Sequence, residues 1–230
     1  MKPRELVKWV NMFIYGDAGV GKTHFISTAQ DDERTSPLLI IDCEGGMATI
    51  RDRDDIDIRR ATSREDLNTI HTDLFKQDEP YYKTVAIDTF SEFAKVNMTR
   101  IMQDAYNKNP AKVDLDVPSP REWGIHLSHI RKILRAFRDL PCHTIFTAHT
   151  NVKTENDVER ITPNIQGQGV REVPGFVDIM GYYRSAPGGK RVMQFAKTAR
   201  VDAKTRYQEL GESIEDPTIP LIFELLTKGT

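Results

Sequence analysis

The feature that most constrains the fold is a glycine-rich octet that follows an apolar run. Its residues are Gly16, Asp17, Ala18, Gly19, Val20, Gly21, Lys22 and Thr23, which fit the pattern G-x-x-x-x-G-K-[ST]. Glycines let the backbone curl so that its N–H groups point at phosphate oxygens, and the following helix directs its positive dipole end at the same anion. The lysine ammonium reaches the β- and γ-phosphates, and the Thr23 hydroxyl is a suitable ligand for Mg²⁺. The octet, together with His24 after it, therefore predicts a binding site for ATP or another nucleoside triphosphate.

The composition is that of a globular protein with a full core. Of the 230 residues, 39% are hydrophobic and 29% are charged. We expect residues 1–230 to form a single domain, because chains of this length commonly fold as one α/β unit. The formal net charge is −2, so any contact with nucleic acid must use local basic patches rather than an overall basic field.

The sequence predicts neither a membrane segment nor an export signal. No apolar run approaches the ~20 residues of a membrane span. Residues 1–9, which we treat as an N-terminal extension, lack the apolar centre of a signal peptide. Cys43 and Cys142 show no metal-ligand spacing, which indicates a reduced, cytoplasmic protein without a membrane partner.

Apolar runs alternate with amphipathic segments, which predicts an α/β fold with a mostly parallel sheet and helices on both faces. Strands are expected at 10–15, 38–41, 84–88, 144–148, 176–184, 191–196 and 219–226. Helices are expected at 22–30, 63–75, 89–106 and 121–140, with Ser63 as an N-cap. The strands at 176–184 and 191–196 are joined by Ala-Pro-Gly-Gly, which predicts an antiparallel hairpin.

Three segments lack regular periodicity. Residues 51–60 are densely charged and are expected to be a solvated surface. Residues 107–120 contain three prolines and are expected to form a loop. Residues 150–175 are polar and are expected to be structureless, and a segment of that length inside a compact domain is usually functional or disordered.

Acidic residues follow two of the buried strands. Asp88 ends the run TVAID and is expected to hold Mg²⁺ with Thr23, although a residue before a helix also suits an N-cap role. Glu44 follows the run LLIID, where the carboxyl end of a parallel strand meets the ligand crevice. There it either activates the water that attacks the γ-phosphate or is a polar loop residue, and the pattern alone leaves both open.

His149 and a basic cluster near the C-terminus are further candidates. His149 ends a strand and either contacts the γ-phosphate or satisfies loop carbonyls. Lys197, Arg200, Lys204 and Arg206 form either a solvated face or a cationic finger that neutralises charge in a neighbouring subunit.

In their order and spacing, five segments resemble the RecA-like ATPase core: GDAGVGKT, LLIIDCEGG, TVAIDTF, TIFTAHT and KTR. Within that group the chain is most similar to short phage-encoded proteins that act as single-strand annealing proteins or core-only recombinases. The resemblance extends from about Met12 to Leu210. It implies a RecA-like fold with a C-terminal antiparallel hairpin extension, ATP and Mg²⁺ as ligands, and the host cytoplasm as location if the chain is phage-encoded.

The resemblance also implies roles for the candidate residues. Glu44 takes the catalytic role, because Thr89 rather than a Glu follows Asp88. His149 stands where RecA-like proteins usually carry a Gln that reports the γ-phosphate to a DNA-binding loop, so this position departs from the family pattern.

Lys204 and Arg206 match the K-x-R element that ring and filament members use as a finger in trans, and Lys197 with Arg200 is the alternative pair. Such a finger implies self-association into a ring or a filament.

Two of the aperiodic segments fall where RecA-like filaments place DNA-binding loops, namely 107–120 and 150–175. In the second segment, Lys153, Arg160 and Arg171 are expected to meet the phosphates of single-stranded DNA. A single-stranded-DNA-binding protein is a further expected partner.

Two other classes of function fit the phosphate loop. One is an ATPase of another class, such as a helicase motor or a small-molecule kinase; a GTPase is disfavoured because no N-K-x-D guanine-reading motif is present. The other is a nucleotide-dependent switch that binds a protein partner without hydrolysis. The replacement Glu44→Gln separates these functions, since only the hydrolysing enzyme loses turnover while it keeps ATP.

Overall fold

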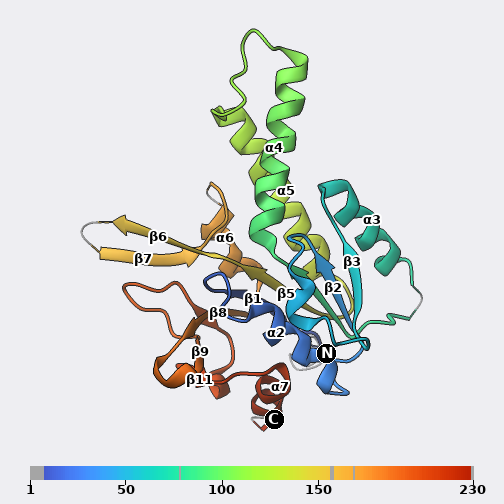
Figure 1. Ribbon diagram of the computed structural model, residues 1–230, viewed down its shortest axis with the longest axis vertical. Helices are drawn as coiled ribbons and strands as arrows, with labels where there is room; N and C mark the ends of the chain where they lie inside the picture. The colour runs from blue at the N-terminus through green and yellow to red at the C-terminus, as the bar shows by residue number, and fades with distance from the viewer. Residues whose placement is uncertain (1–7, 78, 156–157, 168, 229–230) are drawn as a thin grey trace, which may run out of the picture.

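The computed structural model describes residues 8–77, 79–155, 158–167 and 169–228 (Figure 1). Most of the expected N-terminal extension, residues 1–7 of 1–9, lies outside the described residues.

A twisted sheet forms the centre of the molecule, and its strand order is β11-β9-β8-β1-β5-β4-β2-β3, with β10 paired to β8. Its strands are β1 Asn11–Tyr15, β2 Leu38–Asp42, β3 Asp57–Arg60, β4 Thr84–Asp88, β5 His143–Ala148, β8 Ile179–Ser185, β9 Arg191–Gln194, β10 Lys204–Thr205 and β11 Ser213–Glu215. From β8 to β3 all neighbours are parallel, whereas β9, β10 and β11 pair antiparallel. This confirms the predicted α/β fold with a mostly parallel sheet and an antiparallel hairpin extension near the C-terminus.

The parallel strands are apolar because both of their faces are covered. Every residue of β2, β4 and β5 is buried, as expected for a parallel sheet between two helical layers. Phe13, Phe90 and Phe146 pack on one face of the sheet, while Met12 and Phe25 pack on the other. Residues that alternate along β1 therefore enter opposite cores, and this pins the register of the strand.

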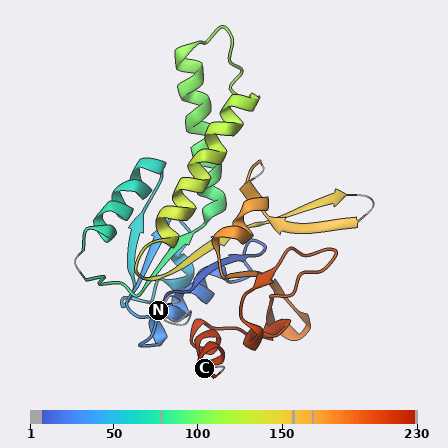
Figure 2. The ribbon, with the colours of Figure 1, turned by 180° about the vertical axis from the view of Figure 1, so that it is seen from behind.

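The helices are α2 Lys22–Ser27, α3 Arg64–Phe75, α4 Phe90–Lys108, α5 Pro120–Arg138, α6 Gly169–Phe176 and α7 Ile219–Lys228. The Ser63 side chain accepts a hydrogen bond from the Asp66 N–H, which confirms the predicted N-cap of α3. Helices α4 and α5 form a hairpin whose far half projects beyond the sheet (Figures 1 and 2). A capping box of Ser119 and Glu122 begins α5, so the predicted loop 107–120 is limited to residues 109–119.

The prediction that residues 150–175 lack structure was wrong. They contain a two-stranded hairpin, β6 Thr150–Glu155 and β7 Val158–Pro163, followed by α6. The hairpin gives little sequence signal because it extends from the core and both of its faces are largely exposed. Its order depends on a distant segment, since the Ile161 N–H donates to the Arg200 carbonyl at 2.6 Å.

One further expectation was wrong. The segment 219–226 is a helix and not a strand, because Ile219, Ile222 and Phe223 are buried at helical spacing. The charged segment 51–60 is largely exposed, as expected, and its end forms β3, an edge strand that pairs parallel to β2. An edge strand tolerates charged side chains because one of its sides has no neighbour.

Candidate functional site

The phosphate loop connects β1 to α2 at the carboxyl end of the sheet. Gly19 and Gly21 have φ values of 75° and 101°, which residues with a Cβ atom rarely adopt. A Cβ on Gly16 would lie 2.2 Å from the Tyr183 carbonyl oxygen, so this position also requires glycine. Helix α2 begins after Gly21 without a side-chain cap, which leaves its N-terminal end to a phosphate.

Lys22 is buried, and its side chain packs against the phosphate loop. Its ammonium donates to the carbonyls of Gly16 and Asp17, both at 2.9 Å. Loss of solvation lowers the pKa of Lys22, an effect that nearby carboxylates, Asp88 foremost, oppose. A triphosphate would supply the negative charge that this buried cation lacks.

Asp88 and Thr23 lie in contact beneath the loop. The Thr23 hydroxyl donates to the Asp88 carboxylate at 2.6 Å, and the Thr147 hydroxyl donates to its other oxygen. Burial raises the pKa of Asp88, and only hydrogen bonds and the charge of Lys22 oppose that rise. A buried carboxylate beside a hydroxyl suits Mg²⁺, because a divalent cation replaces the solvation that burial removed.

The described ranges contain no group of three or more His, Cys, Asp or Glu side chains that could hold a metal by themselves. A Mg²⁺ ion bound through Thr23 and Asp88 would thus share its remaining positions with phosphate and water.

His149 links Glu44 to Lys22. Its Nδ1 lies 3.5 Å from the Lys22 ammonium, which can only donate, so Nδ1 is the acceptor. Nε2 then carries the proton and donates to the Glu44 carboxylate, at 3.1 and 3.2 Å from its two oxygens. The Thr89 hydroxyl also donates to Glu44, at 3.1 Å. The structure therefore brings together Lys22, Glu44 and His149, which the sequence predicts beyond the carboxyl ends of three separate strands.

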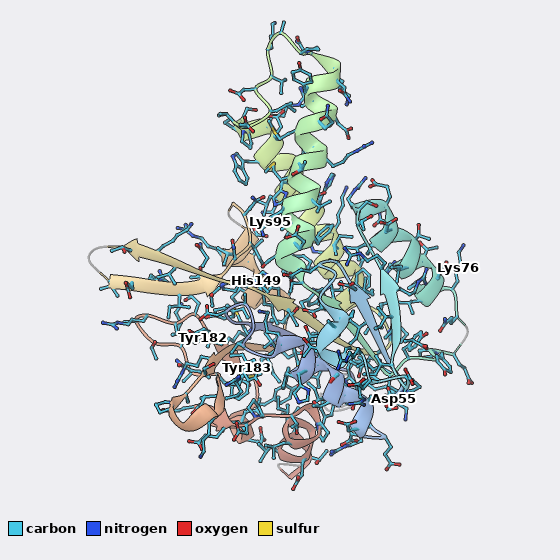
Figure 3. The ribbon with its side chains drawn as sticks, viewed as in Figure 1. Asp55, Lys76, Lys95, His149, Tyr182 and Tyr183 are labelled. Atoms are coloured by element: carbon cyan, nitrogen blue, oxygen red, sulfur yellow. The ribbon has the colours of Figure 1, made fainter. Side chains whose placement is uncertain are left out.

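These groups line a cavity of about 200 Å³. It is bounded by Ala18, Gly19, Gly21, Lys22, Thr23, Glu44, Gly46, Thr49, Asp88, Thr89 and His149. Figure 3 labels His149 near the centre of the molecule, below the α4–α5 hairpin. The Glu44 side chain is 40% exposed, so water can reach it. His24, included among the predicted nucleotide-binding residues, is exposed on α2.

Sequence analysis missed the residues that hold the chemical groups in place. Thr147 supports Asp88, and Ser91 donates to the Asn164 carbonyl at 2.8 Å while it accepts the His149 N–H at 2.9 Å. The Asn164 N–H in turn donates to the His149 carbonyl at 2.8 Å. Single hydroxyl residues carry no pattern of their own, and only the position of Thr147 two residues before His149 gave a hint.

The predicted finger residues Lys204 and Arg206 lie away from the chain's own phosphate loop. Strand β10 pairs with Met180 and Ile179 at the amino end of β8, whereas the loop follows the carboxyl end of β1. The Lys204 ammonium donates to the Val177 carbonyl at 3.1 Å and to the Pro174 carbonyl.

Arg206 is paired within the chain, since its guanidinium donates to Asp178 at 2.8 Å. Lys197 and Arg200, the alternative pair, are exposed on the loop before β10. Tyr15, the last residue of β1, donates to the Asp202 carbonyl of this loop at 2.6 Å. This loop therefore reaches the carboxyl end of β1 at Asp202.

The predicted DNA-binding residues occupy two elements. Lys153 and Arg160 are opposite each other on β6 and β7, and Arg160 also pairs with Asp202 at 2.9 Å. Arg171 is exposed on α6.

Comparison with known proteins places the chain in a family. A family model described as an AAA domain matches residues 8–207, so the chain belongs to this family. The matched residues include the phosphate loop and Asp88, so the protein belongs to the class of P-loop ATPases, which bind nucleotides.

No curated protein matches the sequence. Among solved structures, that of the RadB recombinase is similar with a TM-score of 0.47 and 14% identity, over 90% of this chain and 86% of that chain. In the ranges described above, no helix combines the length and the apolar content that a membrane crossing needs.

Proposed function

We propose that this chain is an ATP-hydrolysing RecA-like protein that binds single-stranded DNA and promotes its annealing or recombination, acting as one domain. The observation that carries this proposal is the linked set of Glu44, His149 and Lys22 on one wall of the phosphate-loop cavity. A site that only held a nucleotide would have no need of a carboxylate that is both hydrogen-bonded in place and open to water.

Each group has one task in this mechanism. The loop and Lys22 bind the phosphates. Thr23 and Asp88 would hold Mg²⁺, which would neutralise phosphate charge when bound. Glu44 takes the proton of the attacking water as a general base. His149 keeps Glu44 oriented and loses its contact with Lys22 when that ammonium turns to the γ-phosphate.

The link to DNA rests on the hydrogen bonds that join His149 to Ser91 and Asn164. Asn164 directly follows β7, so a change at His149 reaches the hairpin that carries Lys153 and Arg160. With Arg171, these residues are the proposed phosphate contacts. With a net charge of −2, a single subunit should bind DNA weakly. A ring or filament would repeat the same basic patches along the strand and so gain avidity.

Assembly would also complete the ATP site. A neighbouring subunit would supply a cationic finger. The exposed Arg200 suits that role better than Lys204, which is hydrogen-bonded in its own chain, or Lys197, which pairs with Asp202 at 3.2 Å. Annealing of phage DNA, with a single-stranded-DNA-binding protein as partner, is the setting that the resemblance implies.

The test compares the wild-type protein with Glu44→Gln and Lys22→Ala, with and without single-stranded DNA. Loss of a general base should lower the rate of ATP hydrolysis by about 10²–10⁴-fold while ATP binding persists. Lys22→Ala should lose both. Gln208→Leu, at an exposed position outside the cavity, is the control.

Three results would each exclude the proposal. Unchanged turnover in Glu44→Gln would exclude Glu44 as the general base. Phosphate transfer to an added nucleoside would indicate a kinase, and directional unwinding of duplex DNA would indicate a helicase motor.

A further inference from the structure

A second cavity, of about 530 Å³, lies between the first half of α5 and the segment that precedes α6. Its wall includes Trp123, Gly124 and His126 of α5, with Gln166 and Gly167 opposite them. The volume falls within the ~300–1,000 Å³ typical of small-molecule sites. None of these residues lines the phosphate-loop cavity.

Two buried polar atoms of this cavity lack a hydrogen-bond partner. In the part of the chain that the structure describes, only three buried side-chain atoms are without one, and His126 Nε2 and Gln166 Oε1 are two of them. His126 is 1% exposed. A buried polar group without a partner is costly, so two of them in one cavity indicate a ligand that pairs with both.

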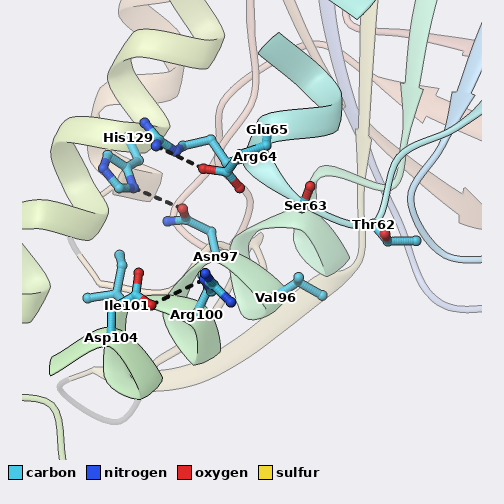
Figure 4. Close-up of a pocket in the computed structure, with 10 residues that line it drawn as sticks. All are labelled: Thr62, Ser63, Arg64, Glu65, Val96, Asn97, Arg100, Ile101, Asp104 and His129. Carbon is cyan, nitrogen blue, oxygen red and sulfur yellow. Dashed lines mark hydrogen bonds and ion pairs between the residues drawn. The ribbon is translucent and has the colours of Figure 1, made fainter. Parts of the chain in front are cut away.

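The chemical character of the two atoms follows from a short hydrogen-bond chain. Asn97 Nδ2 donates to His126 Nδ1 at 3.0 Å, so the proton of the neutral His126 ring is on Nε2. Figure 4 shows the other end of the chain, in which the Asn97 oxygen lies 2.9 Å from His129 Nδ1. Burial lowers the pKa of His126 to about 4, which keeps the ring neutral at pH 7. Two residues that line the cavity therefore carry one unpaired donor, His126 Nε2–H, and one unpaired acceptor, Gln166 Oε1.

An aromatic surface accompanies this donor and acceptor. Trp123 is half-buried, and its ring lies edge-on to His126 with centroids 6.0 Å apart. Gly167 has a φ of 73°, and a Cβ on it would lie 3.0 Å from the Trp123 ring, so its backbone packs closely against the indole. A flat ligand that carries both an acceptor and a donor has the chemistry to stack on Trp123 and to pair with these two atoms.

We propose that this cavity binds an unpaired nucleobase, supplied by single-stranded DNA, which stacks on Trp123 and pairs its exposed edge with His126 and Gln166. All four bases carry a donor next to an acceptor on the edge that duplex pairing uses. The site therefore accepts any sequence and rejects duplex DNA, whose edges are already paired.

The position of the cavity agrees with this occupant. Gln166 is two residues from Asn164, which is hydrogen-bonded to both Ser91 and His149. The exposed Arg121, next to the cavity residue Pro120, can meet a phosphate of the strand. This inference rests on the proposed binding of single-stranded DNA.

The test uses Trp123 fluorescence in a Trp9→Phe background, since the chain has two tryptophans. The probes are an oligo-dT, an abasic oligonucleotide of the same length, and free thymidine. We expect oligo-dT to quench Trp123 and the abasic strand to leave it unchanged.

The variant Gln166→Leu removes the unpaired acceptor and breaks no hydrogen bond of that oxygen, so the protein should keep its Tm. We expect it to bind oligo-dT about tenfold more weakly while its affinity for the abasic strand is unchanged. Gln208→Leu, at an exposed glutamine outside the cavity, should bind both strands like the parent.

The outcomes separate this inference from the proposed function. If both strands bind equally and Gln166→Leu has no effect, DNA binding stands and the base site is refuted. If thymidine quenches Trp123 and neither strand binds, the occupant is a free nucleoside, and both the DNA source and the proposed function fail.

Discussion

Replacing Asp88 by Asn should stabilise the nucleotide-free protein and at the same time weaken its binding of MgATP. The reason is the buried position of the carboxylate, which has two hydroxyl donors but no ion-pair partner in contact. Asn keeps an acceptor for one hydroxyl and can donate to the other. The substitution therefore removes the buried charge and leaves the hydrogen-bonding positions filled.

The size of the gain follows from two opposing contributions. An ionised group buried in a protein costs several kcal/mol in lost solvation, and each hydrogen bond to it returns about 1.5–3 kcal/mol. The pKa of Asp88 is raised although both hydrogen bonds and the charge of Lys22 oppose that rise, so the cost of burial is the larger contribution. We therefore expect the free energy of unfolding of Asp88→Asn to exceed that of wild type by about 1–2 kcal/mol. In a domain of this size the Tm should rise by roughly 2–8 °C.

The dependence of stability on pH tests separately whether Asp88→Asn stabilises the protein. Burial raises the pKa of folded Asp88 above the unfolded value of about 3.9, so the folded state holds the proton more tightly. The wild-type protein therefore loses stability from this group as pH rises through the interval between the two values. The advantage of Asp88→Asn should therefore be larger at pH 8 than near pH 4.

The assay is thermal unfolding of both proteins at pH 4 and pH 8, with and without MgATP. MgATP should raise the Tm of wild type more than that of Asp88→Asn, because binding to the folded state stabilises it by mass action. Asp42→Asn is the matched control, since Asp42 pairs in register with Asp88 but contacts Arg60 at 2.7 Å. It should lose stability. A lower Tm for Asp88→Asn at pH 8, or an equal response to MgATP, would refute the reasoning.

Three further substitutions test separate features. Gly16→Ala places a Cβ 2.2 Å from the Tyr183 carbonyl, so ATP affinity by fluorescence titration should fall at least about tenfold; retained affinity would contradict the close packing. Ser63→Ala removes the α3 cap and should cost about 1 kcal/mol in urea unfolding with ATP hydrolysis unchanged. His149→Ala frees Glu44 from one of its two supports and should slow hydrolysis about tenfold, a loss of about 1.4 kcal/mol, with ATP binding kept; an unaffected rate would exclude the orienting role.

The structure shows why local motifs could be predicted from the sequence and why features that depend on distant residues could not. The phosphate loop, the Ser63 cap and the strand that ends at Asp88 depend on residues adjacent in sequence, and each is present as expected. The hairpin β6–β7 depends on the distant Arg200 carbonyl, and no periodicity within 150–163 reports that contact.

By itself, the sequence determined the phosphate loop, the position of Asp88 at the end of a buried strand and the alternation of buried strands and helices, because each follows from neighbouring side chains and their spacing. Only the tertiary structure decided that His149 meets both Glu44 and Lys22, since strand order sets which carboxyl ends adjoin. It also decided that His126 and Gln166 share a cavity without partners, because burial of a polar atom is a property of the packed chain. The phosphate loop thus identifies a nucleotide-binding site, and the packing of distant strands brings Glu44 and His149 next to it.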